Sequence, residues 1–398
     1  MPVQRRQAVI LSAARTAIGR FQGTLSSMPA PKLGGVAIRE AVRRSGVDPA
    51  MVDEVLMGNV VSAGTGQAPA RQAAMAGGLP PSVGAASINK VCGSGLKAVM
   101  LAAGMIAAGD ADIVVAGGME NMDLGPYLLP QGRTGYRLGN VIVVDATVHD
   151  GLWCAFENWH MGMAAEYIAQ EFGITRQMQD EFALASHQKA VKAITAGLFK
   201  DEIVPVEIPQ RKGSSLLFDT DEAPRADTTL EALSKLRPAF QPDGGTVTAG
   251  NAPGITDGAA ATVVAGLDTA ERLGLKPLAR ITGYAQGALE PKRIFYAPVL
   301  AIRNLLQKTG TTLADYDLFE INEAFSAQVL ADGKELGLDW SRVNVHGGAV
   351  ALGHPIGASG ARILTTLLYA LRHHGGRLGM AALCLGGGEA VALAVEMM

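Results

Sequence analysis

Short apolar runs alternate along the chain with longer segments in which apolar positions recur at helical spacing. The stretches 8–11, 112–118 and 380–385 are apolar runs of strand length. A helical pattern opens with Ala30-Pro31, since proline is favoured in the first turn of a helix. Helices and strands that alternate in this way are typical of an α/β protein with a layered, largely parallel sheet.

The same order of elements occurs twice. The helix that opens with Ala-Pro at position 30 leads to a strand that ends near Asn59. About 265 residues later, an Ala-Pro pair at position 297 opens a helix that leads to a strand ending near Asn322. The Gly-Ser-Gly helix start at 93–95 is echoed by Ala-Ser-Gly at 358–360. The repeat predicts two homologous halves packed about a pseudo-twofold axis.

Residues 121–248 fit neither repeat and predict an inserted loop domain. This segment contains several glycine-rich turns and a charged helical stretch at 175–196. We therefore expect an N-terminal half formed by 1–120 with about 249–271, and a C-terminal half formed by 272–398. The insertion is the part of the chain in which we expect ligand contacts.

Composition narrows the classes of function. With 398 residues, 48% hydrophobic residues and 49 glycines, the chain can build a large core with many turns. A formal charge of −3 without a block of like charges indicates no nucleic-acid partner. Three cysteines fit a reducing compartment, and the apolar run 98–108 is too short to span a bilayer. We expect a cytoplasmic protein with no membrane partner.

Cys92 stands before the Gly-Ser-Gly turn that opens a helix rich in Ala, Met and Leu. Unpaired N–H groups and the helix dipole favour an anion at such a position. We therefore expect the pKa of Cys92 to lie below the value of about 8.5 of a free cysteine, which makes the thiol a nucleophile. A lone cysteine is more often a small buried apolar residue, so the interpretation requires further reactive groups.

Two glycine-rich runs near the C-terminus supply such groups. His354 lies in a constrained turn between Gly353 and Pro355, and Cys384 stands beside three glycines at the end of an apolar run. A cysteine near a helix start with a distant histidine is the arrangement of an activated thiolate, and the second cysteine suggests a proton carrier. The other histidines show no metal-ligand spacing, and we expect no metal.

These runs, and most of the sequence between them, resemble the thiolase family, specifically its acetyl-CoA acetyltransferase branch. Four segments match the family's active-site motifs in order and spacing, namely 88–98 around Cys92, Asn-Glu-Ala-Phe at 322–325, 345–362 around His354 and 383–389 around Cys384. Segments 160–162, 235–240 and 248–251 match its substrate-binding loop region. The resemblance implies α/β/α/β/α layers, with the insertion receiving coenzyme A.

The reaction that the resemblance implies is reversible acyl transfer on coenzyme A thioesters, with a carbon–carbon bond formed or broken and no permanently bound cofactor. Cys92 attacks the acyl-CoA carbonyl, His354 takes the thiol proton, and Cys384 as a thiolate removes an α-proton from a second acyl-CoA. Two oxyanion holes are required. The N–H groups of Cys92 and Gly386 form one, and His354 Nε2 with a water held by Asn322 forms the other.

The partners implied are acyl-CoA and CoA, and we expect a homodimer or homotetramer. The resemblance implies that His160 and Met161 contact the pantetheine and the acyl group, and that Arg225 contacts the CoA nucleotide. The full set of predicted substrate contacts is Leu152, His160, Met161, Arg225, Phe240, Ala249, Pro253, Ala324 and Phe325.

Two segments depart from the family pattern. Pro253 replaces a serine of the related Asn-Ala-Ser-Gly loop, which removes a hydroxyl and stiffens the loop. Ile294-Phe295-Tyr296-Ala297 replaces a Met-Gly-x-Gly segment of the acyl pocket. We expect a pocket of altered shape, and therefore an altered acyl preference with the same chemistry.

Two alternative functions stay open at this point. Condensing enzymes of the 3-ketoacyl synthase type combine a cysteine with two histidines, or with a histidine and an asparagine, and the second cysteine here argues against that class. A non-catalytic thiolase-like protein that binds lipid or serves as a scaffold could lose Cys92, His354 or Cys384, and this chain keeps all three.

Overall fold

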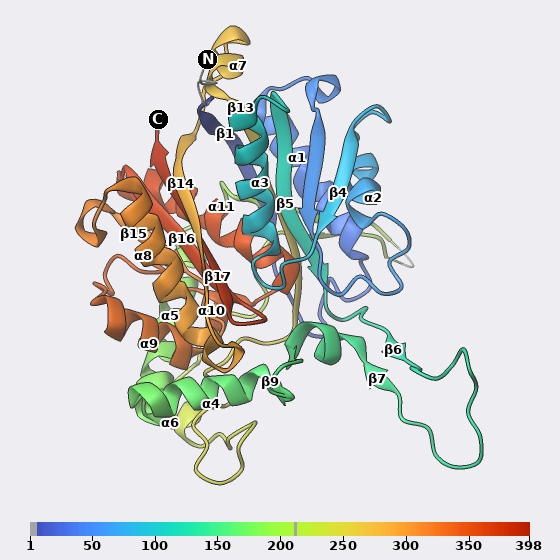
Figure 1. Cartoon of the computed structure of the whole chain (residues 1–398), viewed down its shortest axis with the longest axis vertical. Coiled ribbons are helices and arrows are strands. Elements are labelled where there is room, and N and C mark those ends of the chain that lie inside the picture. The colour runs from blue at the N-terminus through green and yellow to red at the C-terminus, as the bar shows by residue number, and fades with distance from the viewer. Residues whose placement is uncertain (1–5, 211–212) are drawn as a thin grey trace.

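The computed structural model describes residues 6–210 and 213–398, and its strands form two halves of the same topology (Figure 1). The first half orders its strands β1-β13-β5-β3-β4, and the second β14-β17-β16-β15. Their bounds are β1 Ala8–Thr16, β3 Glu54–Gly58, β4 Gly84–Ile88, β5 Ile113–Asn121, β13 Thr256–Gly266, β14 Ala279–Ala288, β15 Leu318–Ile321, β16 Leu378–Leu385 and β17 Glu389–Met397.

The strand pairing confirms the predicted repeat. In each half the first two pairings are antiparallel and the third is parallel, β1-β13-β5-β3 matching β14-β17-β16-β15. β4 extends the first half in parallel, and Val343 makes the corresponding parallel bridge to Phe319 of β15. Among the described strands, a short pairing of β1 with β14, at Val9 and Ile10, connects the sheets of the two halves.

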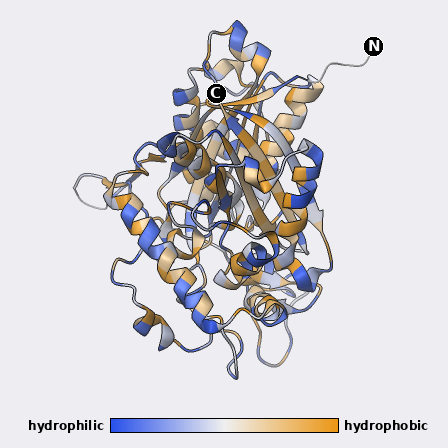
Figure 2. Ribbon diagram, turned by 90° about the vertical axis from the view of Figure 1, so that its left-hand side faces the viewer, coloured by the Kyte–Doolittle hydropathy of each residue, from blue (hydrophilic) through white to orange (hydrophobic). Residues whose placement is uncertain are grey.

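Helices cover both faces of each half, which confirms the predicted α/β/α/β/α layers. α1 (Ala30–Ser45) and α2 (Pro69–Ala76) lie on the outer side of the first half, and α8 (Ala297–Thr309) covers the second. α3 (Ser94–Ala108) and α11 (Ile356–His374) form the central layer, where α11 contacts strands of both halves. Figure 2 shows the apolar strands of this interior, surrounded by outer helices that carry polar faces.

Two glycines allow the central helices to approach each other at their N-terminal ends. A Cβ added to Gly95 of α3 would lie 2.8 Å from the backbone nitrogen of Ala361, and one added to Gly360 of α11 would lie 2.4 Å from that of Leu96. Any side chain would therefore force the backbones apart. The close crossing brings together the two helix starts that follow Cys92 and His354.

The remaining elements surround this frame. β5 ends at Asn121 and β13 begins at Thr256, and the intervening segment returns to the sheet where β10 pairs with β1. The predicted domain boundaries stay a prediction. The further elements are β2 Gly19–Arg20, β6 Tyr127–Leu128, β7 Val144–Asp145, β8 Trp153–Cys154, β9 Trp159–His160, α4 Met161–Phe172, α5 Arg176–Thr195, β10 Ile203–Val204, β11 Val206–Ile208, β12 Leu216–Phe218, α6 Leu230–Ser234, α7 Leu267–Arg272, α9 Ser326–Leu336 and α10 Ala349–Leu352.

By length and composition alone, Val91–Ala108 is apolar enough to cross a membrane, and it is longer than the apolar run 98–108. Within it, α3 packs against β5, β3 and α11 in the central layer. A helix that is buried in the core of a folded domain is apolar on all sides, and burial of α3 in the central layer accounts for the apolar composition of this stretch.

Candidate active site

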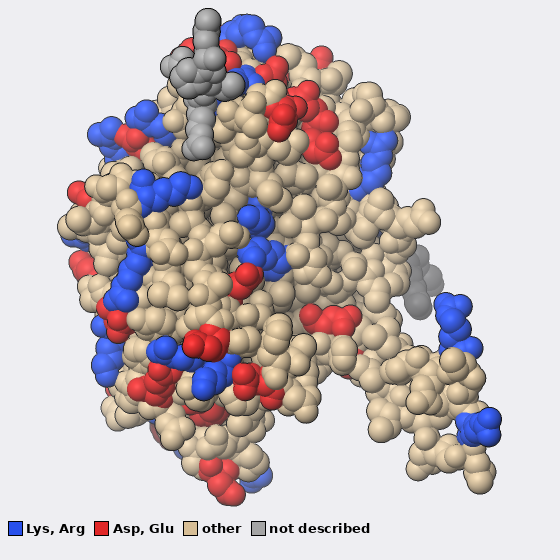
Figure 3. Space-filling model, in the orientation of Figure 1, with Lys and Arg blue, Asp and Glu red and all other residues tan. Residues whose placement is uncertain are grey.

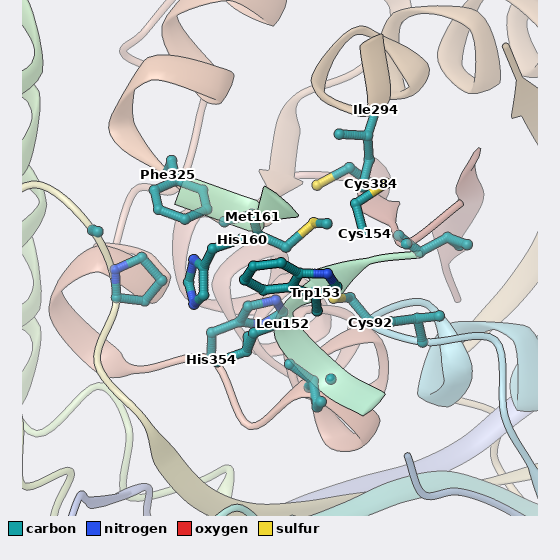
Figure 4. A pocket seen from close by; sticks show the side chains of 18 of the residues that line it. Cys92, Leu152, Trp153, Cys154, His160, Met161, Ile294, Phe325, His354 and Cys384 are labelled. Atoms are coloured by element: carbon teal, nitrogen blue, oxygen red, sulfur yellow. The ribbon is translucent and has the colours of Figure 1, made fainter. Parts of the chain in front are cut away.

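A cavity of about 690 Å³ opens where the two central helices begin, and both halves and the insertion contribute to its wall. Figure 4 shows the side chains of Cys92, His354 and Cys384 gathered around it. Of the predicted residues, those that line it are Cys92, Leu152, His160, Met161, Phe240, Ala249, Pro253, Ala324, Phe325, His354, Cys384 and Gly386. Asn322 and Arg225 are not among the lining residues.

Cys92 lies in a tight turn two residues before α3. The preceding residue, Val91, has a φ of 45°, which is strained for a β-branched side chain. Ser94 stabilises the turn, because its hydroxyl accepts a hydrogen bond from the backbone N–H of Lys90 at 2.8 Å and donates one to the carbonyl of Val91 at 2.6 Å. The turn directs the thiol into the cavity.

The expected low pKa of Cys92 is wrong for the resting site. Burial raises the pKa of this thiol to about 12, although hydrogen bonds from the backbone N–H groups of Cys92 and Gly386 act in the opposite direction. The apolar wall therefore outweighs the helix start, and the thiol is neutral at pH 7. Gly386 also lines the cavity, and the predicted oxyanion hole of the Cys92 and Gly386 N–H groups stays a prediction.

His354 is buried, and the surroundings keep its ring neutral. It follows Gly353, whose φ of 110° favours glycine, and it precedes Pro355 at the start of α11. Burial lowers the pKa of His354 to about 3, and the nearby charge of Arg362 adds to this effect. Because the ring is neutral, one of its nitrogens carries a lone pair that can act as a base, which is the first requirement of the predicted chemistry.

Asn322 contacts His354 from behind the cavity wall. Its Nδ2 lies 3.4 Å from both Nδ1 and Nε2 of the ring, which is long for a hydrogen bond. The side chain is buried at the end of β15. The structure therefore brings Asn322 to the predicted histidine, and its role in an oxyanion hole stays a prediction.

Cys384 lies at the end of β16 with 1% of its surface exposed. Burial raises the pKa of Cys384 well above its usual value, and Cys92 and Asp332 add to the shift. The resting group is thus a thiol, whereas the predicted role as a carbon base requires a thiolate. Cys384 must lose its proton during the reaction before it can act in this role.

Sequence reasoning missed Glu120, a carboxylate buried at the end of β5. It accepts hydrogen bonds from Asn59 Nδ2 at 2.8 Å, the N–H of Val60 at 3.0 Å and the N–H of Gly357 at 2.9 Å. Because Gly357 lies in the first turn of α11, Glu120 connects the first half to the loop of His354. Burial raises the pKa of Glu120 to about 7. Nothing in its sequence neighbourhood indicates this role.

Aromatic side chains form the apolar part of the wall. The rings of His160 and Phe240 stack with centroids 4.7 Å apart, and Phe325 packs against Phe295 at 5.4 Å. His160 Nδ1 also accepts the N–H of Gly162 at 3.0 Å, which fixes its ring. These residues shape a slot for an apolar group rather than a charged one.

Only part of segment 294–297, which departs from the family pattern, faces the cavity. Ile294 and Phe295 line it, whereas the hydroxyl of Tyr296 donates a hydrogen bond to Glu335 at 3.0 Å and Ala297 begins α8. The wall also contains residues without a distinctive sequence signal, namely Trp153, Cys154 and Phe156.

Arg225 has an exposed side chain, and its N–H donates to His187 Nδ1 at 3.2 Å. Its predicted contact with the CoA nucleotide stays a prediction. Within residues 6–210 and 213–398, no three His, Cys, Asp or Glu side chains are placed to hold a metal ion.

Comparison with known families matches nearly the whole chain. The thiolase N-terminal domain matches residues 8–268, and the thiolase C-terminal domain matches residues 275–397. The chain belongs to the thiolase family. The observed layers and repeat are those of a thiolase.

Individual relatives agree with this assignment. The acetyl-CoA acetyltransferase of Cupriavidus necator is 56% identical over 388 residues, which cover 98% of both chains. That of Escherichia coli is 55% identical over 392 residues, which cover 98% of this chain and 99% of the relative. The crystal structure of the Bacillus anthracis acetyl-CoA acetyltransferase superposes with a TM-score of 0.97 at 44% identity and covers all of both chains.

Proposed function

We propose that the protein is a thiolase that joins two acyl-CoA thioesters into a 3-ketoacyl-CoA and free CoA, and that also runs the reverse thiolysis. The observation that carries the proposal is the convergence of Cys92, His354 and Cys384 on one cavity, whose wall also contains Gly386. The relatives named acetyl-CoA acetyltransferase support the same reaction. A cysteine at 384, rather than a second histidine, does not favour a 3-ketoacyl synthase.

In the first half-reaction, Cys92 passes its proton to Nε2 of His354 and attacks the thioester carbonyl. The negative charge that develops on the carbonyl oxygen faces the N–H groups of Cys92 and Gly386. The adduct then expels the CoA sulfur, which takes the proton of Cys384. The site now holds an acyl-Cys92 thioester, a Cys384 thiolate and a protonated His354, so every proton is placed.

In the second half-reaction, the Cys384 thiolate removes the α-proton of a second acyl-CoA. The N–H at Nε2 of His354 stabilises the enolate oxygen while the enolate carbon attacks acyl-Cys92. Collapse of this adduct releases the Cys92 sulfur, which recovers its proton from His354. The sequence restores all three resting groups, in agreement with the neutral thiols and the neutral imidazole that burial produces.

Mass spectrometry tests the proposal directly. After exposure to acetyl-CoA, one acetyl group should be found on the peptide that contains Cys92, and the Cys92→Ser variant should lose turnover while it keeps its fold. A label on Cys154 or Cys384 instead would show that the nucleophile is wrongly assigned. Absence of both the label and acetoacetyl-CoA thiolysis in the wild type would remove the enzyme assignment.

The acyl preference follows from the wall segment of this chain. Ile294 and Phe295 are bulky, buried and part of the cavity lining. We propose that the site accepts chains longer than acetoacetyl, or branched acyl groups, alongside the short substrates. Thiolysis rates for acetoacetyl-CoA, 2-methylacetoacetyl-CoA and 3-ketoacyl-CoAs of increasing length test this statement, and a strict preference for acetoacetyl-CoA would refute it.

An apolar hairpin supports assembly into a homodimer or homotetramer. Residues 125–146 project from the body of the protein, and much of their surface is uncharged in Figure 3. Leu138 and Ile142 are exposed to 107% and 81%, which is costly for a lone chain in water. We propose that copies of this chain cover the hairpin. Light scattering should give a multiple of the chain mass, and Leu138→Asp with Ile142→Asp should reduce it.

We also propose a cytoplasmic location. Cys92, Cys154 and Cys384 are all free thiols, which suits a reducing compartment. Fractionation of cells that express the tagged full chain tests this proposal, and recovery outside the cytoplasm would contradict it.

A further inference from the structure

The hydroxyl of Ser359 lies at the ring nitrogen of His354 that faces away from the proposed chemistry. Ser359 is completely buried in α11, and its Oγ lies 2.6 Å from His354 Nδ1. The same Oγ lies 2.9 Å from the carbonyl oxygen of Pro355. A serine hydroxyl has one hydrogen to donate, so these two contacts constrain each other.

The Pro355 carbonyl determines the direction of both hydrogen bonds. A carbonyl oxygen only accepts, and the 2.9 Å contact is a hydrogen bond from the Ser359 hydroxyl, in addition to the bonds that the same oxygen accepts from the backbone N–H groups of Ala358 at 2.8 Å and Ser359 at 2.9 Å. If Ser359 donated to His354 instead, two oxygens would face each other without a hydrogen between them. Because its hydrogen points to the Pro355 carbonyl, the Ser359 hydroxyl can only accept a hydrogen bond from the His354 ring. The proton of neutral His354 is then on Nδ1, and Nε2 carries a lone pair.

The first half of the fold contains a corresponding serine, Ser94, whose donor and acceptor roles are unambiguous. Ser94 occupies the matching position at the start of α3, where it donates to the carbonyl of Val91 and accepts the backbone N–H of Lys90. A backbone N–H can only donate, so Ser94 must act as the acceptor there. The pseudo-twofold repeat therefore places one serine hydroxyl near each reactive residue, and this hydroxyl makes one contact as a donor and one as an acceptor.

We propose that Ser359 is a positioning residue that selects the tautomer of His354, holding the proton on Nδ1 so that Nε2 is free to accept the proton of Cys92. The inference rests on the proposed function, because it assigns Nε2 as the base. When Nε2 gains the proton, the ring becomes an imidazolium, and Ser359 still accepts from Nδ1 without having to reorient. Asn322 Nδ2, at 3.4 Å from both ring nitrogens, does not distinguish them.

The test compares Ser359→Ala with Ser359→Thr, which keeps a hydroxyl, and with a matched control on the same helix. Thr365 is also fully buried in α11, and its hydroxyl donates to the carbonyl of Ala361 at 2.9 Å. Thr365→Val therefore removes an equivalent hydrogen bond that does not involve His354. Two readouts are taken, the rate of Cys92 acetylation by acetyl-CoA and the ¹⁵N NMR signals of His354 in protein labelled at histidine, assigned with His354→Asn.

We expect the wild-type spectrum to show a protonated Nδ1 and an unprotonated Nε2. In Ser359→Ala the signals should move toward the other tautomer, and acetylation should slow by about 10–100-fold. Ser359→Thr should recover most of the rate, and Thr365→Val should behave as the wild type. A wild-type ring protonated on Nε2, or a Ser359→Ala variant with unchanged signals and rate, would overturn the inference.

The two readouts separate this inference from the proposed function. If the wild type does not acetylate Cys92, the proposed function fails, while the ring signals still decide whether Ser359 selects the tautomer. If Ser359→Ala does not fold, the wild-type signals alone decide, since they report the position of the proton directly.

Discussion

Gly386 provides the sharpest test of the oxyanion hole, because an added methyl group meets one identifiable neighbour. A Cβ on Gly386 would lie 3.1 Å and 3.2 Å from the two γ-carbons of Val91, and 3.5 Å from its Cβ. The Gly386 backbone is not among the left-handed glycines, so alanine fits its dihedral angles. The whole perturbation therefore acts through Val91, the strained residue before Cys92.

The size of the effect follows from this contact. Contacts of 3.1–3.2 Å require a displacement of a few tenths of an ångström between the Gly386 loop and the Cys92 turn. Complete loss of one oxyanion donor costs about 10²–10³ in kcat. A donor that is displaced rather than lost should cost less, so Gly386→Ala should lower kcat by roughly 10–100-fold, which corresponds to about 1.4–2.7 kcal/mol.

The assay is thiolysis of acetoacetyl-CoA, followed by its absorbance, together with the rate of Cys92 acetylation. Adding Val91→Ala to Gly386→Ala removes both close γ-carbons and should restore much of the lost kcat. Gly254→Ala is the matched control, since it lines the same cavity and its added Cβ meets nothing within 4 Å. Full activity of Gly386→Ala, or no recovery in the double variant, would refute the placement of this oxyanion hole.

The other predictions concern the second half-reaction, the acyl pocket and pH. Cys384→Ala should still form acyl-Cys92 but lose condensation by at least about 10²–10³, and equal impairment of both steps in stopped-flow assays would contradict the division of roles. Ile294→Met with Phe295→Gly should shift kcat/KM toward acetoacetyl-CoA by about 10–200-fold, and an unchanged chain-length profile would exclude this segment from the acyl pocket. Burial lowers the pKa of His346 to about 4, so its contribution to the free energy of unfolding is present above pH 6.5 and decreases as pH falls toward 4. In urea titrations over this range, His346→Asn should reduce the pH slope by up to about 1.4 kcal/mol per pH unit, and an unchanged slope would contradict a neutral buried ring.

Local signals in the sequence were enough to predict part of this fold. The Ala-Pro pairs at 30 and 297 mark the first residues of α1 and α8, because proline suits the first turn of a helix. The helical stretch predicted at 175–196 is α5, Arg176–Thr195, whose N-cap Thr175 accepts a backbone N–H. The repeated order of such elements was sufficient to predict two matching halves.

The protonation states of the site residues depend on the packed structure. A helix start favours a thiolate, and this local effect is visible in the sequence of Cys92. The opposing desolvation comes from cavity walls contributed by distant segments, and it raises the pKa of Cys92 to about 12. Burial is a property of the packed whole, so the neighbours of a cysteine in the chain cannot reveal which effect is larger.

Packing also decided which members of a motif reach the cavity. Ile294 and Phe295 line it while Tyr296 points to Glu335, although all three are adjacent in sequence. Ser359 was recognised only as part of a helix start, and its role depends on a contact with His354 that the turn at Pro355 creates. Residue type and spacing therefore identified the chemistry, whereas side-chain direction and desolvation depend on contacts between distant segments, which only the folded structure defines.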